Sequence, residues 1–301
     1  MKFLRLLFLG LFATLVVAQE RPADTSADRA RANFARPITL AADDIRQFPE
    51  PPTEYRDLPS TGLRGRLEVF DYDSTVTRTR RKAQVYLPSG YSSEKRYPVL
   101  YLLHGIGGNE YEWTGYVKAQ AIIDNLIAAG RAVPMIVVMP NGRAMADDRP
   151  PANPFTPENV KAFAAFEHDL LGSLIPAVQA KYSTLSDREH RALAGLSMGG
   201  GQTLNFGLSH LDTFAWLGAF SSAPNTRPPA ELLPNPTAMR AQLKLLYLSC
   251  GNKDGLINFS QAVHVYAKEH DIPHIWNVDD HAHDGDTWGS NLYQFTQRIF
   301  R

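Results

Sequence analysis

The stretch Ala192-Leu193-Ala194-Gly195-Leu196-Ser197-Met198-Gly199-Gly200-Gly201 decides the fold of this chain. An apolar run of strand length ends at Ser197, and glycines stand two residues before and two residues after that serine. In this G-x-S-x-G pattern a strand turns sharply into a helix and holds the serine hydroxyl exposed at the end of the strand. The free N–H groups at the start of such a helix favour developing negative charge. The pattern therefore predicts that Ser197 is a nucleophile.

Further apolar runs alternate with amphipathic segments on both sides of this stretch. The runs cover residues 99–103, 135–139, 191–196, 214–220, 245–249 and 275–278. Continuous apolar runs suit strands that are covered on both faces, so the alternation predicts an α/β fold with a mostly parallel central sheet and helices around it. Residues 67–72 and 82–87 are expected to form an antiparallel pair ahead of it. One helical stripe is expected to pack on the sheet; its members are Phe163, Phe166, Leu170, Leu174 and Val178.

The ends of later strands supply partners for the serine. A serine hydroxyl needs a base to take its proton and a third group to orient that base. In a parallel sheet these groups are expected in the chain order serine, acid, histidine. Asp254 follows the run 245–249, and His283 follows the run 275–278. We therefore predict that Ser197, Asp254 and His283 form a catalytic triad.

Other titratable side chains lie close to His283. His281 is an alternative base, but His283 stands directly before the segment that closes the chain as a helix and carries Trp288. Four aspartates are too close in sequence to reach the His283 ring easily and are expected to be solvated; they are Asp279, Asp280, Asp284 and Asp286. A metal cluster is the other interpretation of this loop. Its spacing fits poorly and no distant third ligand accompanies it, so neither a metal nor a cofactor is predicted.

The loop that leaves the run 99–103 is rich in glycine. Its sequence is His104-Gly105-Ile106-Gly107-Gly108. Backbone N–H groups of Met198 and of Ile106 are expected to form an oxyanion hole. A phosphate cradle is the alternative, but no Lys-Ser/Thr pair follows the loop. Trp113 and Trp288 come soon after the two site loops and are expected to line an acyl or sugar pocket, with a core or lid position as the alternative for each.

The N-terminal part of the chain predicts export. Lys2 and Arg5 precede an apolar run that is too short to span a membrane, so residues 1–18 are expected to be a signal peptide and the mature protein to be secreted or periplasmic. An uncleaved anchor or a buried helix is the alternative. Residues 19–60, rich in Pro, Ala and charge, are expected to be a linker or an arm on the domain, or else a propeptide or a partner-binding arm.

The charge balance and the cysteine count limit the classes of binding partner and of covalent cross-link that are expected. Lys plus Arg equals Asp plus Glu at 31 each, so nothing indicates nucleic acid as a partner, and no membrane association is expected of the mature protein. The single cysteine, Cys250, excludes an internal disulfide. It lies at the end of an apolar run and is expected to be a packed core thiol rather than a nucleophile.

Taken in order, the motifs resemble one family. Segments 86–91, 97–108, 195–200 and 251–254, together with His283 and Trp288, resemble carbohydrate esterase family one of the α/β-hydrolases, which includes feruloyl and acetylxylan esterases. The resemblance covers roughly residues 64–301, so residues 61–301 are expected to form an α/β-hydrolase esterase domain. The chain departs from the family at Asp280, His281 and Ala282, where glycines are common, which leaves the fine specificity open.

The resemblance implies a secreted serine carboxylesterase that forms an acyl-enzyme. The expected substrate is an ester of a plant polysaccharide, and the expected activity is that of a feruloyl esterase releasing hydroxycinnamates from cell-wall xylan. An acetylxylan esterase or another small-acyl esterase is the alternative within this chemistry. A catalytically silent, carbohydrate-binding relative is the alternative outside it.

Overall fold

The structure is a computed structural model that describes residues 31–32, 35–59 and 64–301. The predicted signal peptide, residues 1–18, lies outside the described residues, and so does the predicted domain boundary between residues 60 and 61. In the part of the chain that is described, no helix is long and apolar enough to cross a membrane.

Eight strands of residues 64–301 form one sheet in the order β1-β2-β4-β3-β5-β6-β7-β8. The strands are β1 (Arg66–Asp73), β2 (Arg80–Leu87), β3 (Val99–Leu103), β4 (Ile136–Pro140), β5 (Arg191–Leu196), β6 (Trp216–Phe220), β7 (Leu245–Gly251) and β8 (Ile275–Asp279). β2 pairs antiparallel with β1 and with β4, and the neighbours from β4 to β8 are parallel. The predicted mostly parallel sheet is therefore confirmed.

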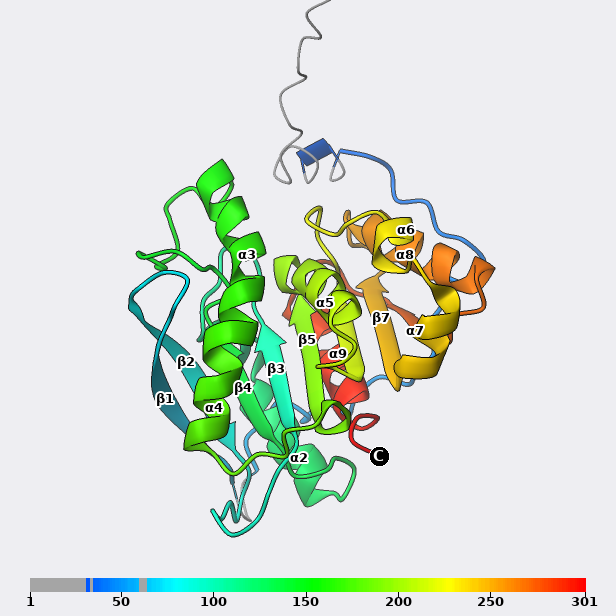
Figure 1. Cartoon of the computed structure of the whole chain (residues 1–301). Helices are drawn as coiled ribbons and strands as arrows, with labels where there is room; N and C mark the ends of the chain where they lie inside the picture. Colours follow the sequence, from blue (N-terminus) through cyan, green and yellow to red (C-terminus); the bar gives the residue numbers. More distant parts are fainter. Residues whose placement is uncertain (1–30, 33–34, 60–63) are drawn as a thin grey trace, which may run out of the picture.

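Helices cover both faces of this sheet (Figure 1). The α-helices are α2 (Ala119–Ala128), α3 (Pro157–Asp169), α4 (Ile175–Lys181), α5 (Met198–Ser209), α6 (Pro229–Leu232), α7 (Pro236–Gln242), α8 (Ile257–Glu269) and α9 (Gly285–Thr296). Short helical segments of other types are η1 (Trp113–Val117), η2 (Leu170–Leu174) and η3 (Arg188–His190). α3, α4, α5 and α8 lie on one face, and α2 and α9 lie on the other.

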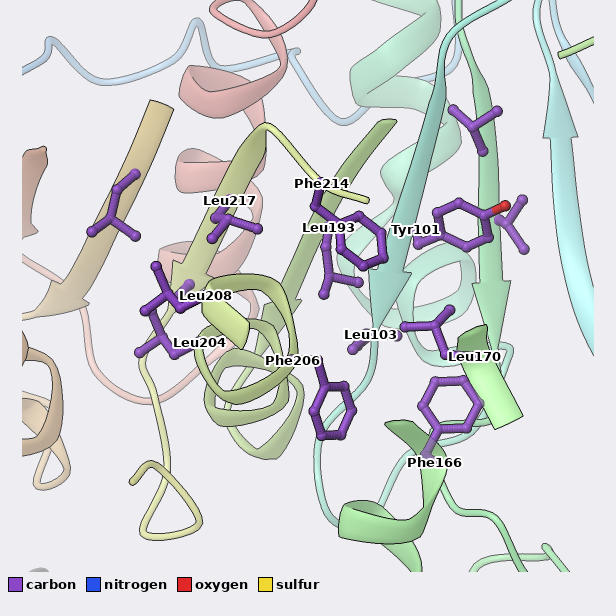
Figure 2. Close-up of a cluster of buried hydrophobic side chains, with 14 of the residues drawn as sticks. Tyr101, Leu103, Phe166, Leu170, Leu193, Leu204, Phe206, Leu208, Phe214 and Leu217 are labelled. Carbon is purple, nitrogen blue, oxygen red and sulfur yellow. The ribbon is translucent and has the colours of Figure 1, made fainter. Parts of the chain in front are cut away.

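The two faces carry separate hydrophobic cores because successive strand side chains point to opposite sides. On one face Tyr101 and Leu193 pack with Phe166 and Leu204 from the helices (Figure 2). On the other face the neighbouring strand residues Leu100, Leu102, Ala192 and Ala194 pack with side chains of α2 and α9. Both sides of the central strands are therefore buried, and their continuous apolar sequence has its explanation.

The predicted helical stripe is buried as expected, but its helix is not uniform. Its turns widen to π-helical geometry over η2, directly before Pro176 in the first turn of α4. Proline has no N–H to donate to the carbonyl four residues earlier, so a regular α-helix cannot continue through this position. The change in geometry keeps Leu170, Leu174 and Val178 on the sheet side of the helix.

Residues 41–58, called the N-terminal arm below, contain no regular helix or strand and lie against the domain. The Val278 N–H of β8 donates to the Ile45 carbonyl, and the Trp276 indole donates to Asp44. The Phe48 ring packs on Tyr247 of β7, and the Tyr55 ring meets Tyr293 of α9 edge to face. The arm thus adds its apolar side chains to the core of the main domain.

Candidate active site

The turn between β5 and α5 holds Ser197 in a rare backbone conformation, with φ 53° and ψ −118°. A Cβ on Gly195 would lie 2.4 Å from the Gly199 carbonyl oxygen, and a Cβ on Gly199 would lie 2.4 Å from the Leu103 carbonyl oxygen. Both positions therefore require glycine. The Ser197 backbone is fixed from both sides, since its N–H donates to the Phe220 carbonyl and its own carbonyl accepts from Ala223.

The structure brings the three predicted side chains together. Ser197 follows β5, Asp254 follows β7, and His283 follows β8. His283 Nε2 lies 2.9 Å from Ser197 Oγ, and His283 Nδ1 lies 2.7 Å from Asp254 Oδ2. The Asp254 side chain is fully buried, while the His283 side chain is 21% exposed. The imidazole thus lies between the buried Asp254 carboxylate and the Ser197 hydroxyl.

The environment of Asp254 keeps it ionised. Burial on its own would raise the pKa of this carboxyl, but the hydrogen bond and charge of His283 and the N–H of Leu256 outweigh burial and lower the pKa. Cys250 Sγ donates to the same Oδ2 at 3.3 Å. Burial and the nearby Asp254 charge raise the pKa of the Cys250 thiol well above its usual value, so the thiol stays protonated. The prediction of a packed core thiol is confirmed.

Hydrogen bonds from neighbouring side chains hold the backbone of the glycine-rich loop 104–108. The Gly105 N–H donates to Glu112 Oε2 at 2.7 Å, and Arg143 Nη1 donates to the Gly108 carbonyl at 2.6 Å. His104 Nδ1 donates to the Gly105 carbonyl, and His104 Nε2 accepts from the Gly142 N–H at 2.7 Å. Each of these contacts fixes the backbone of the loop, so its N–H groups have set directions.

Burial changes the pKa values of two side chains next to the loop, His104 and Glu112. Burial, with Arg143 nearby, lowers the pKa of His104 to about 3, so the ring is neutral and its two nitrogens can play opposite roles. Burial raises the pKa of Glu112. Its bond to Gly105 directs the carboxyl at the loop backbone.

The predicted oxyanion donors lie on the two elements that meet at Ser197. Met198 is the first residue of α5, where the first N–H groups of a helix have no acceptor within the helix. Met198 is thus next to Ser197 in the sequence, and Ile106, which is partly buried, packs against the small cluster that contains Met198. The role of both residues as donors stays a prediction.

Neither Glu112 nor Arg143 was predicted from the sequence to be a site residue. Asn141 and Arg143 follow β4, so the rule that strand ends carry site residues could have pointed to Arg143. Glu112 directly precedes Trp113 and carries no signal of its own in a single sequence. The Arg143 side chain is buried and donates to the carbonyls of Gly108 and Asp148, so one guanidinium ties the loop after β4 to loop 104–108.

The expectation for Trp113 needs correction. The side chain is 1% exposed, its indole N–H donates to the Leu103 carbonyl, and its ring packs edge to face on Phe220. Trp113 is therefore a core residue beneath the site and does not line a pocket. Trp288 is also largely buried, but its ring meets the His283 ring edge to face at 5.1 Å. Its substrate contact stays a prediction.

The polar residues around His283 are not simply solvated, which corrects a second expectation. Asp279 is fully buried and accepts from Asn291 and Thr287 of α9. Asp284 caps the N-terminus of α9. Asp280 and Asp286 are exposed but pair with arginines of the N-terminal arm. These side chains thus hold the loop in place.

His281 does not face the serine, because its Nε2 lies 3.4 Å from Glu50 of the arm. Among the described residues, no three His, Cys, Asp or Glu side chains are grouped closely enough to hold a metal ion.

Comparisons with known proteins agree with this geometry. The family described as "Putative esterase" matches residues 74–292. An endo-1,4-beta-xylanase/feruloyl esterase of Xylanibacter ruminicola is 33% identical over 244 residues, which cover 79% of this chain and 32% of that protein. The chain spans a third or less of the length of the first curated relatives that it matches.

Solved structures show the same fold. A CE1 ferulic acid esterase of Anaeromyces mucronatus, solved with ferulic acid, superposes with a TM-score of 0.74 at 28% identity, over 87% of this chain and 98% of that one. The feruloyl esterase module of Clostridium thermocellum gives a TM-score of 0.69 at 22% identity, over 87% of this chain and 97% of that one, which supports the fold alone. The predicted resemblance is confirmed, and the chain belongs to the esterase family of α/β-hydrolases, the carboxylic ester hydrolases that include the feruloyl and acetylxylan esterases.

Proposed function

We propose that the chain is a secreted serine carboxylesterase, a feruloyl esterase that releases hydroxycinnamates from plant cell-wall xylan. The observation that carries the proposal is the unbroken chain of hydrogen-bond distances from Ser197 Oγ through His283 to the buried Asp254. A serine hydroxyl in contact with an oriented imidazole is the arrangement that acyl transfer needs.

The first half of the reaction forms the acyl-enzyme. His283 Nε2 takes the proton of Ser197 Oγ as that oxygen attacks the ester carbonyl, and a tetrahedral oxyanion forms. The N–H groups of Met198 and Ile106 stabilise its charge; removing one such donor typically costs about 10²–10³ in rate. The carbon–oxygen bond to the sugar then breaks, and His283 returns the proton to the departing sugar hydroxyl.

The second half repeats these steps with water. His283 takes a proton from a water molecule that attacks the acyl-enzyme, and the second tetrahedral intermediate collapses to the free acid and Ser197. Asp254 stays a carboxylate throughout, and it stabilises the imidazolium that forms twice in each cycle. The lowered pKa of Asp254 suits that role.

An apolar cluster beside the triad supports an aromatic acyl group. It contains Met198, Ala223 and Leu256, with Ile106 and Phe259 partly buried against it. Met198 adjoins the nucleophile, and Leu256 lies two residues beyond the acid, so the cluster borders the place where an acyl chain would lie. The ferulic acid complex of the Anaeromyces enzyme and the feruloyl esterase named in the Xylanibacter relative support the same substrate class.

The expected preference is for methyl ferulate over acetyl esters. An apolar wall gains more from a phenylpropenoyl group than from a methyl group, because more apolar surface leaves water. The measurement is kcat/KM for methyl ferulate against p-nitrophenyl acetate and acetylated xylan. A hundredfold preference for acetyl, roughly 2.7 kcal/mol of transition-state discrimination, would replace the feruloyl assignment with an acetylxylan esterase and leave the serine chemistry intact.

Export is part of the proposal. The charged and apolar N-terminal segment 2–17 supports it. We expect the mature protein to begin near Gln19 and to be recovered outside the cytoplasm, as N-terminal sequencing of the exported protein would measure. An exported form that still begins at Met1 would contradict cleavage.

A further inference from the structure

The N-terminal arm, residues 41–58, contacts the loop that carries His283. The arm lies outside residues 74–292, the part of the chain that the family model matches. Its side chains nevertheless reach residues 280–281 on one side of His283 and residues 285–286 on the other. The histidine therefore lies between two attachments to a segment that is more than 200 residues away in the sequence.

The first attachment is a small network. Arg46 Nη2 lies 2.8 Å from Asp280 Oδ2, and Arg46 Nη1 pairs with Glu50, four residues further along the chain. Glu50 in turn lies 3.4 Å from His281 Nε2. Asp280 also accepts from Asn252 of the loop that leads to Asp254. Arg46 thus holds Asp280, the residue whose bond to Asn252 joins the loop of the base to the loop of the acid.

The second attachment is Arg56. Its Nη2 donates to the Gly285 carbonyl, and its Nη1 lies 2.8 Å from Asp286 Oδ1. The guanidinium lies directly on Gly289 of α9, where an added Cβ would stand 2.4 Å from Nη2. Arg56 therefore bridges the first turn of the helix that follows His283, and the glycine leaves room for it.

Such ion pairs at a surface usually contribute little, because water screens them and the side chains lose entropy. The ion pairs of Arg46 and Arg56 differ from such pairs because the arm that carries both arginines is itself fixed to the domain. Phe48 and Tyr55 pack on the core, the Ile45 carbonyl accepts from β8, and Gln294 of α9 donates to the Pro49 carbonyl at 3.0 Å. A fixed arm makes each arginine a rigid tie between two parts of the domain.

We propose that Arg46 and Arg56 are positioning residues that hold the His283 loop so that His283 Nε2 stays within hydrogen-bond distance of Ser197 Oγ. The inference rests on the proposed function, in which His283 is the base. A general base works only when its nitrogen stays within hydrogen-bond reach of the hydroxyl, and a misplacement of about 1 Å can cost on the order of 10²-fold in rate. Releasing the loop on either side of His283 loosens that distance without removing any reacting group.

The test compares Arg46→Gln and Arg56→Gln in the full-length protein, with Asp43→Asn as the matched control. Asp43 lies on the same arm, but it pairs with Lys268 and His264 of α8, away from the His283 loop. With p-nitrophenyl acetate, each glutamine variant is expected to lose roughly tenfold in kcat with KM within about twofold of the starting protein. Asp43→Asn is expected to keep its kcat.

Two further readouts separate positioning from general weakening of the fold. The rate of covalent inactivation by phenylmethanesulfonyl fluoride, which reacts at the activated serine without a sugar leaving group, is expected to fall in parallel with kcat. Arg46→Lys, which keeps the charge opposite Asp280, is expected to recover most of the lost kcat. If Arg56→Gln fails to fold, Arg56→Lys replaces it, since lysine cannot donate to Gly285 and Asp286 in the same fork geometry.

The inference is overturned if both glutamine variants keep the full kcat while their thermal midpoints fall, or if Asp43→Asn loses as much kcat as they do. Ser197→Ala and His283→Ala are measured beside them. Turnover retained by those two variants would reject the proposed function itself. Their inactivity, together with fully active arm variants, would reject this inference alone.

Discussion

Replacing Ser197 with alanine is expected to lower ester turnover by about 10⁶-fold, the usual loss on removal of a triad nucleophile. The reason is that Ser197 Oγ lies 2.9 Å from His283 Nε2, so its removal leaves the base without the hydroxyl that it activates. The fold should survive, because the backbone of this turn is held by Phe220 and Ala223 through main-chain bonds that alanine retains. Stopped and steady-state assays with methyl ferulate measure the loss, and circular dichroism checks the fold.

Ser209→Ala is the matched control for that experiment. Ser209 ends the same helix α5, and its hydroxyl donates to the Asn205 carbonyl, so its loss removes a hydroxyl without touching the triad. Its activity should match the starting protein. If a clean preparation of Ser197→Ala kept more than a few per cent of the activity, Ser197 would not be the nucleophile.

Replacing His283 with alanine is expected to be as damaging as the serine change, at about 10⁶-fold, and Asp254→Asn to cost about 10⁴-fold. The asparagine keeps the shape of the side chain but favours the wrong tautomer of His283, so Nε2 no longer accepts the serine proton. His281→Ala should cost far less, because its ring faces Glu50 rather than Ser197.

The two histidine variants form their own control, since they lie two residues apart in one loop. Initial rates with p-nitrophenyl acetate and methyl ferulate rank them. A larger loss for His281→Ala than for His283→Ala would show that His283 is not the base and would contradict the triad described above.

The fold and the three triad residues could be predicted from the sequence because both follow from the positions of the strands and their ends. Apolar runs located β3 to β8, and parallel strands bring their carboxyl ends to one edge. Polar residues directly after those runs therefore had to lie close together. Asp254 and His283 could be chosen on this ground without knowledge of any contact.

The directions of side chains within loops could not be predicted from the sequence. Trp113 follows loop 104–108 closely in sequence, but in η1 its indole turns inward and donates to the Leu103 carbonyl. Asp279 looked like a solvated loop residue, yet α9 lies over it and supplies Asn291 and Thr287. Glu112 and Arg143 act on backbone groups several residues away, and periodicity and spacing give no information on such contacts.

The position of the arm on β8 also protects an edge of the sheet from pairing with another copy of the chain. β1 and β8 are the outermost strands of the sheet in the described residues 64–301. β1 carries the charged residues Arg66, Glu68, Asp71 and Asp73, which discourage pairing with another chain. β8, with the sequence Ile-Trp-Asn-Val-Asp, has little such protection. The arm covers that edge, where its Ile45 carbonyl accepts a hydrogen bond from the Val278 N–H. Removal of the arm would therefore leave an apolar edge strand open to intermolecular pairing and aggregation.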